Sequence, residues 1–213
     1  NTDIKFVFVS TDKAVNPKNV LGMTKRIAEI LIVGKNDEYA YKKNKIQIVR
    51  FGNVLGSAGS AIPKFIDQIR NGKPITITDL KMKRYFMNIS EAANLVIEST
   101  GIRNKNNQIF ILKMGKQIKI INIAKKLFEF YKNKDQNFKF KITGNISNEK
   151  IGENLSISKK KIATNNKKIF LVNEPTCQKK YFNQFITKLN KTCLTNNNEI
   201  SLKLLKSFFK KYN

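Results

Sequence analysis

The apolar positions of the 213-residue chain alternate between short continuous runs and longer stripes at helical spacing. The run IKFVFVS, at residues 4–10, is almost wholly apolar, which is typical of a strand covered on both faces of a parallel sheet. In residues 22–33 the apolar side chains, among them Ile27 and Ile30, recur instead on one helix face. The chain is therefore expected to begin with a buried strand and an amphipathic helix.

The same alternation continues through the first two thirds of the chain. KIQIVRF, PITIT, IFIL and FKFKI read as strands, and PKFIDQIRN, SEAANLVIEST and IINIAKKLFEFY read as helices. Ser90 is the expected N-cap of the SEAANLVIEST helix. Alternating strands and helices predict an α/β fold with a Rossmann-like parallel sheet.

The pattern changes near residue 151, after which the chain is rich in Lys and Asn. One strand-like run, KIFLV, and a terminal amphipathic helix, ISLKLLKSFFKKY, stand out in this part. We expect residues 1–151 to be the C-terminal part of a Rossmann-like catalytic domain with substrate-binding segments, and 152–213 to be a small substrate-side lobe with a helical tail. The apolar face of the terminal helix should dock on the protein itself rather than on a membrane.

The net charge of the chain is strongly positive. Its 41 Lys and Arg residues against 15 Asp and Glu residues give +26. Such a surplus attracts polyanions. The lysines are nevertheless spread along the chain, and they are enriched together with Asn and Ile, as AT-rich coding sequence would produce. A nucleic-acid partner is therefore not expected.

The composition also limits the chemistry that the chain can perform. It contains no His, and Cys177 and Cys193 lack the spacing of a metal site, so zinc ligation and histidine acid/base catalysis are not expected. Any general acid or base must be Asp, Glu, Lys or Tyr. The chain has neither an apolar run of membrane-spanning length nor a signal-peptide pattern, which favours a cytoplasmic location.

Several sequence blocks occur in the same order as in a known family. STDKAVNP, NVLGMTKR, VRFGNVLGSAGSAIPKF, PITIT and RYFMNISEAANLV, between residues 6 and 96, resemble the extended short-chain dehydrogenases of polysaccharide biosynthesis, the CapD-like nucleotide-sugar 4,6-dehydratases. A weaker resemblance continues to about residue 170. It implies a UDP-N-acetylhexosamine substrate, tightly held NAD, a 4-keto-6-deoxy sugar product for glycan synthesis, and a homo-oligomer.

The resemblance also implies roles for residues at the end of the first predicted strand and in the following helix. Asp12 would protonate the departing C6 hydroxyl of the sugar, and Lys13 would be the base at C5. Thr11 would be the hydroxyl that assists oxidation, with Lys25 nearby to stabilise its deprotonated form. Ser10 and Lys25 would bind the cofactor.

Position 21 departs from the usual short-chain dehydrogenase pattern. Four residues before the cofactor-binding lysine these enzymes carry a tyrosine, whereas this chain carries Leu21. The longer CapD-like proteins have methionine there, in a motif like NVMGATKR. Leu21 is therefore expected to be a packing residue on the apolar stripe of the helix.

Five further residues match positions that lie near the substrate in the family. They are Asn53, Thr76, Thr78, Arg84 and Glu149. An amide can bind sugar or phosphate oxygens directionally, and a guanidinium can grip a pyrophosphate with two hydrogen bonds.

One substrate-binding segment differs from the family pattern. Where the family typically reads TGLRPGEKL, residues 143–151 read TGNISNEKI, so Ile146 replaces an arginine and Asn148 a glycine. One contact to the nucleotide should therefore be missing.

The glycine fingerprint of a dinucleotide-binding half, GxGxxG after a strand, does not precede Ile4, and GNVLGSAGS has a different spacing. The first nucleotide-binding half is therefore expected to be missing from this chain, either because the chain is truncated or because a separate N-terminal NAD-binding half supplies it. Membrane association through such a missing N-terminal region stays open by resemblance.

Two alternative functions also stay open. The first is a nucleotide-sugar C4 epimerase, although Asp12 and Lys13 favour dehydration because an epimerase needs no elimination acid and base. The second is a non-catalytic protein, either a degenerate nucleotide-sugar binder or a basic module that binds polyanions.

Overall fold

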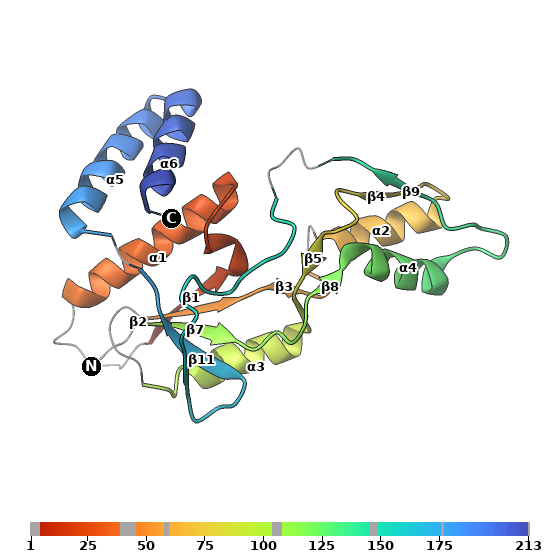
Figure 1. The fold of residues 1–213 in the computed structure, drawn as a ribbon, viewed down its shortest axis with the longest axis horizontal. Coiled ribbons are helices and arrows are strands. Elements are labelled where there is room, and N and C mark those ends of the chain that lie inside the picture. Colours follow the sequence, from red (N-terminus) through yellow and green to blue (C-terminus); the bar gives the residue numbers. More distant parts are fainter. Residues whose placement is uncertain are drawn as a thin grey trace.

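The computed structural model of the protein describes residues 5–38, 46–57, 60–103, 108–144, 149–175 and 177–212. At its centre lies a five-stranded sheet (Figure 1). In spatial order its strands are β1 (Phe6–Thr11), β2 (Ile46–Phe51), β7 (Gln108–Leu112), β11 (Ile169–Asn173) and β10 (Lys161–Ala163). β1, β2 and β7 are parallel, whereas β11 and β10 run antiparallel to their neighbours. The predicted α/β fold with a parallel sheet is confirmed.

Two helices cover opposite faces of this sheet (Figure 1). They are α1 (Val20–Glu38) and α3 (Ile89–Ser99). The central strands β2 and β7 are buried almost throughout, and Val49, Phe110 and Leu112 are fully enclosed. Their continuous apolar runs are those expected of strands covered on both faces.

A second lobe holds a small separate sheet. It is made of α2 (Ala61–Arg70), β4 (Ile75–Ile77), α4 (Ile120–Tyr131) and β9 (Phe140–Ile142). β9 pairs in parallel with β4, and both helices pack on the pair through Phe65, Ile69 and Phe128. The FKFKI strand therefore exists as predicted but lies outside the main sheet.

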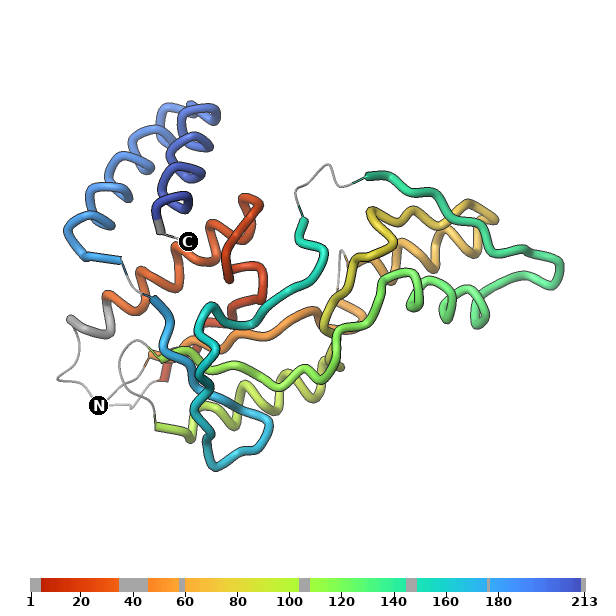
Figure 2. The backbone as a smooth tube through the Cα atoms, in the orientation of Figure 1, coloured from red at the N-terminus to blue at the C-terminus, as the bar shows by residue number. Residues whose placement is uncertain are grey.

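Short strand pairs link the second lobe to the main sheet. β3 (Asn53–Val54) pairs with β6 (Phe86–Met87), and β5 (Lys83–Arg84) pairs with β8 (Ile118–Lys119). Figure 2 shows the teal segment that begins at residue 149 returning from the second lobe to the main sheet. This return path continues into β10 and β11, so part of the region beyond residue 151 belongs to the central sheet.

The C-terminal residues form a helical hairpin of α5 (Lys179–Leu194) and α6 (Asn198–Tyr212), which packs on α1 (Figure 1). The rings of Phe185 and Phe208 stack with centroids 4.0 Å apart. Leu205 and Phe209 are buried in the same cluster. The expectation that the apolar face of the terminal helix docks on the protein itself is confirmed.

The predicted cap of α3 is wrong. The N-cap is Asn88, whose side chain accepts a hydrogen bond from the Glu91 backbone N–H at 2.6 Å, and Ser90 lies inside the helix. Asn, like Ser, is a strong N-cap residue. The sequence offered two suitable caps two positions apart, and the earlier one is used.

A buried ion-pair cluster ties α1 to the main sheet. Arg50 and Glu29 are both fully buried, and their side chains form two contacts, Nη2 to Oε2 at 2.7 Å and Nε to Oε1 at 3.0 Å. Arg26 and Ser10 also donate to the Glu29 carboxylate, at 3.0 and 2.6 Å. Burial pushes the pKa of Glu29 upward, but the attraction of Arg50 and the other donors outweighs it and holds the pKa below its ordinary value.

A helix that spans a bilayer must be both long and apolar. In the ranges that the structure describes, no helix combines the length and the apolar character needed to cross a bilayer.

Replacing Arg50 with Met should destabilise the protein by about 3–5 kcal/mol, because it leaves the Glu29 carboxylate buried without its two-contact partner. Urea unfolding followed by circular dichroism measures this loss. Lys203→Met is the matched control, since Lys203 pairs with Glu199 on the exposed surface of α6 and its removal should change little. An equally small loss for Arg50→Met would contradict the importance given to the buried pair.

Candidate functional site

The carboxyl end of β1 leads directly into a short 3-10 turn, η1 (Asp12–Ala14). Thr11 has an extended backbone and caps this turn, because its hydroxyl oxygen accepts a hydrogen bond from the Lys13 N–H at 3.4 Å. The Thr11 hydroxyl donates in turn to Asp12 Oδ1 at 3.0 Å. Ser10 turns the other way, toward α1, where its hydroxyl is used by Glu29. The strand end therefore presents Thr11, Asp12 and Lys13, but not Ser10, to the site.

Asp12, Lys13 and Asn53 form one hydrogen-bonded group. The Lys13 ammonium lies 3.2 Å from Asp12 Oδ1 and 2.9 Å from Asn53 Oδ1, while Asn53 Nδ2 donates to the Tyr85 carbonyl. Asp12 is 0% exposed, and no described residue forms a hydrogen bond with its Oδ2. A buried carboxylate oxygen without a partner is unusual in a folded protein and marks this group as a candidate site for a ligand.

A cleft of about 570 Å³ opens beside this group, toward the second lobe. It is lined by six residues that the sequence singled out: Lys13, Asn53, Thr76, Thr78, Arg84 and Glu149. Ser60 and Lys64 line it from the N-terminal part of α2, and Phe65 and Phe86 add apolar surface. The cleft thus combines apolar walls with a few converging polar groups, as small-molecule sites commonly do.

Thr76 is partly committed to the protein. Its hydroxyl oxygen accepts from Gln68 Nε2 at 2.9 Å, and its N–H donates to Gln68 Oε1 at 3.0 Å. The hydroxyl hydrogen of Thr76 remains available for a ligand in the cleft.

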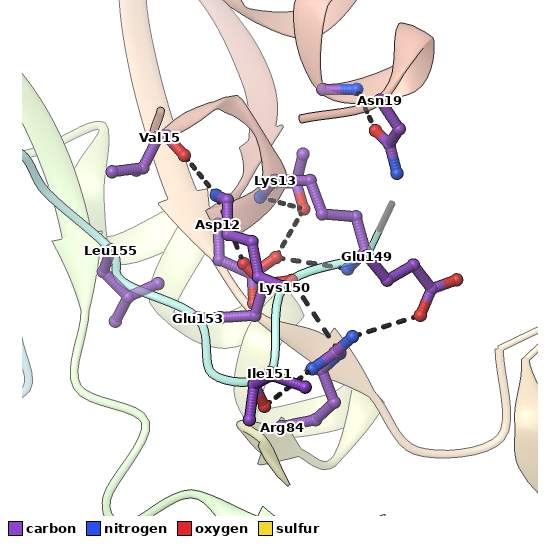
Figure 3. Close-up of polar contacts among 12 residues, drawn as sticks. Asp12, Lys13, Val15, Asn19, Arg84, Glu149, Lys150, Ile151, Glu153 and Leu155 are labelled. Atoms are coloured by element: carbon purple, nitrogen blue, oxygen red, sulfur yellow. Dashed lines mark hydrogen bonds and ion pairs between the residues drawn. The ribbon is translucent and has the colours of Figure 1, made fainter. Parts of the chain in front are cut away.

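Residues 149–155, here called the strap, cross the site opposite η1 (Figure 3). Arg84 Nη2 contacts Glu149 Oε2 at 3.1 Å, and its Nη1 donates to the Lys83 carbonyl at 2.8 Å. Lys150 Nζ donates to the Val15 carbonyl, which immediately follows η1. The strap therefore contacts both the segment that follows η1 and the guanidinium of Arg84, which lines the cleft.

Lys150 and Glu153 are site residues to which the sequence gave no role. Glu153 is 3% exposed, and its carboxylate lies 3.4 Å from Lys150 Nζ and 3.8 Å from Arg84 Nε. Burial raises the pKa of Glu153, and the negative charge of Asp12 raises it further against the pull of Lys150 and Arg84. Burial lowers the pKa of Lys150, and Glu153 works against that shift. The sequence signals this pair only through residues 149–153, EKIGE, in which Lys150 and Glu153 stand three positions apart.

Lys25 lies beside β1 rather than on Thr11. Its ammonium sits 5.1 Å from the ring centroid of Phe8, in a cation–π contact. Thr11 instead donates to Asp12, and in the described part of the chain no hydrogen bond joins it to Lys25. The structure therefore does not bring these two predicted site residues together directly.

The expected packing role of Leu21 is wrong. Leu21 is 55% exposed and lines a small pocket of about 100 Å³, together with Lys13, Lys150 and Glu153. It occupies the first turn of α1, where the side chain turns toward the site and not into the apolar stripe. The two departures from the family pattern at Ile146 and Asn148 lie outside the described residues.

The architecture defines the class of protein. In open parallel α/β sheets, ligands bind beyond the carboxyl ends of the strands, and here the polar group and the cleft lie at that edge. The model of the polysaccharide biosynthesis protein family matches residues 2–174, so the chain belongs to this family. The resemblance inferred from the sequence blocks is thereby confirmed.

Three individual proteins illustrate what the chain is similar to. It is 46% identical over 151 residues to the capsular polysaccharide biosynthesis protein CapD of Staphylococcus aureus, a match covering 71% of this chain and 25% of CapD. It is 36% identical over 155 residues to a UDP-glucose 4-epimerase of Rickettsia canadensis, a match covering 73% of this chain and 44% of that protein. The structure of Pen from Bacillus thuringiensis matches with a TM-score of 0.68 and 34% identity, covering 82% of this chain and 54% of Pen. The chain thus spans about half or less of these proteins.

Gly22→Ala should destabilise the protein by about 1–3 kcal/mol, because a Cβ there would lie 2.3 Å from the Lys13 carbonyl oxygen and would push η1 away from α1. Gly34→Ala is the matched control in the same helix: nothing lies within 4 Å of its added Cβ, and it should stabilise by about 0.5–1 kcal/mol. Urea unfolding measures both. Equal effects of the two substitutions would contradict the close approach of η1 to α1.

Proposed function

We propose that the chain is the substrate-side part of an NAD-dependent nucleotide-sugar 4,6-dehydratase, which converts a UDP-N-acetylhexosamine to a 4-keto-6-deoxy sugar for polysaccharide biosynthesis. The observation that carries the proposal is the contact of 3.2 Å between Lys13, which lines the cleft, and the fully buried Asp12 behind it. Membership of the polysaccharide biosynthesis family supports chemistry on a nucleotide sugar.

The charges around the cleft suit a diphosphate ligand. Lys13, Lys64 and Arg84 line it against Glu149, the one acidic residue among the described lining residues. Arg84 can offer two parallel N–H groups to a phosphate, a geometry that lysine does not provide. A UDP-sugar would therefore lie with its pyrophosphate near Arg84 and its sugar toward Asp12 and Lys13.

The Asp12–Lys13 contact suits the elimination step. Loss of water across C5 and C6 needs a base that takes the C5 proton and an acid that protonates the leaving C6 hydroxyl. Moving one proton from the Lys13 ammonium to the Asp12 carboxylate across their hydrogen bond gives a neutral amine and a carboxylic acid, the two forms that elimination requires. Asn53 accepts a second hydrogen bond from Lys13 and fixes the direction of the amine.

NAD, when bound, would take a hydride from sugar C4 and return it to C6. In this chain Thr11, at the end of β1, and Lys25, on α1, are the residues proposed to face it. Ser10 contributes by holding the strand end against Glu29. The GxGxxG segment that would bind the pyrophosphate of NAD is not in this sequence.

The uncovered edge of β1 suits a separate N-terminal NAD-binding half. Among the described strands β1 pairs only with β2, and its Phe6 and Val9 are 52% and 45% exposed. Strands in parallel sheets are normally covered on both faces, and an edge strand offers free N–H and C=O groups to a further strand. We propose that the NAD-binding half adds its own strand to this edge.

A C4 epimerase is the second candidate, favoured by the 36% identity to the Rickettsia canadensis protein named as such. Epimerisation would leave the C6 hydroxyl in place. The product therefore separates the two candidates: a 4-keto-6-deoxy sugar indicates dehydration, and a sugar inverted at C4 indicates epimerisation.

The isolated chain should show no turnover of UDP-N-acetylglucosamine, and it should gain turnover when a nucleotide-binding half that carries GxGxxG is co-expressed with it. Product formation followed by mass spectrometry and NMR makes the test. Turnover by the isolated chain would refute the need for a separate half.

In the complemented protein, Asp12→Asn should lower the rate of elimination by about 10²–10⁴-fold, because an amide cannot deliver a proton to the leaving hydroxyl. Leu21→Tyr is the companion variant and should be tolerated, since Leu21 is exposed at the pocket edge and has no proton to contribute. An Asp12→Asn protein with full dehydratase activity would remove Asp12 from its role.

A further inference from the structure

Charged side chains of both signs meet where the strap crosses η1 (Figure 3). Six such groups surround this point: Asp12, Glu149 and Glu153 as carboxylates, and Lys13, Arg84 and Lys150 as cations. When all six are ionised their formal charges cancel. A ligand with two negative charges would therefore enter a site with no net charge to attract it.

Glu153 stands between the cations of this cluster. Its carboxylate faces Lys150 at 3.4 Å and Arg84 at 3.8 Å, and its Oε2 has no hydrogen-bond partner among the described residues. The Glu153 carboxylate therefore links two cations with different positions in the site. Lys150 donates to the Val15 carbonyl next to η1, and Arg84 lines the cleft.

The backbone of Glu153 is fixed from outside the strap. Gln117 Nε2 donates to the Glu153 carbonyl at 2.8 Å, and the Glu153 N–H donates to Gln117 Oε1 at 3.1 Å. Two residues further on, Arg50 donates to the Leu155 carbonyl at 2.8 Å. The backbone that carries Glu153 is thus fixed on both sides, and its carboxyl group lies buried against Lys150 and Arg84.

We propose that Glu153 is a positioning residue for the anionic ligand: it orients Arg84 and Lys150, and it takes up one proton when a nucleotide diphosphate-sugar binds in the cleft. The inference rests on the proposed function, and it names a residue and a proton exchange that the proposed chemistry alone does not require.

The charges of the cluster give the direction of the effect. With Glu153 protonated the six groups carry a net charge of one positive unit, which favours an anion. Burial already raises the pKa of Glu153, Asp12 raises it further, and Lys150, Arg84 and Lys13 oppose them. A bound diphosphate adds negative charge nearby and would raise this pKa again. Ligand affinity should therefore rise as the pH falls toward the range in which Glu153 takes up its proton.

Calorimetric titration with UDP-N-acetylglucosamine between about pH 8 and pH 5.5 tests the proposal, since neither phosphate of this diester titrates there. The wild-type protein should bind more tightly at lower pH, by at most about tenfold per pH unit because one proton is taken up. Glu153→Gln, which is uncharged throughout, should lose this pH dependence. Glu129→Gln, which removes a carboxylate on the surface of α4 away from the cleft lining, should keep it.

A second measurement needs no ligand. A glutamate whose pKa is raised by folding supports the folded state below its unfolded pKa and loses that contribution as the pH rises through its folded pKa. The melting temperature of Glu153→Gln, minus that of the wild type, should therefore increase as the pH rises from about 4 to about 8.

The outcomes separate the two proposals. If the wild-type protein binds no UDP-N-acetylglucosamine at any pH, the proposed function fails, and the melting temperatures still decide whether Glu153 takes up a proton. If Glu153→Gln keeps the wild-type pH dependence of binding, or if its melting temperature differs from the wild type by the same amount at every pH, the role of Glu153 is overturned.

Discussion

The buried contact between Arg50 and Glu29 is the constraint on which both the fold and the site depend. Arg50 lies on β2 and Glu29 on α1, so the pair sets how the helix lies on the sheet. Because both groups are fully buried, neither can be solvated if the other moves away. The Arg50 guanidinium also reaches Glu174 at the end of β11 and the carbonyl of Leu155 in the strap. One side chain therefore connects the parallel strands, the covering helix and the site.

The site follows from this arrangement because its two halves come from distant parts of the chain. η1 is carried by β1, which α1 holds through Ser10 and Glu29, and the strap is held by Arg50 at Leu155. Arg84 reaches the same point from β5, on the short strands that connect the two lobes. The buried charged groups among them, Asp12, Arg84 and Glu153, need such a rigid frame, since each would otherwise turn toward water.

Sequence reasoning predicted the strands and helices well where burial leaves a local pattern, as in β1, β2 and α1. It could not predict that FKFKI pairs with β4 outside the main sheet, because an apolar run reveals a strand but not its partner. α5 was missed although Phe182, Phe185, Ile186 and Leu189 have helical spacing, since Lys and Asn between them suggested low complexity. The place of Glu153 was not predictable, because its contacts with Arg84 and Gln117 join residues 69 and 36 positions apart in the sequence.

The exposed side chain of Leu21 shows how the chemistry is divided between the parts of the site. Position 21 opens on the small pocket beside Lys13, Lys150 and Glu153, yet a hydrocarbon there can neither give nor take a proton. Under the proposed function, proton transfer would rest on η1 and the strap, where three ammonium and guanidinium groups face three carboxylates. An apolar wall beside these groups limits the water that reaches them and strengthens the interactions among them. Leucine at this place therefore supports the charged cluster without taking part in its proton exchange.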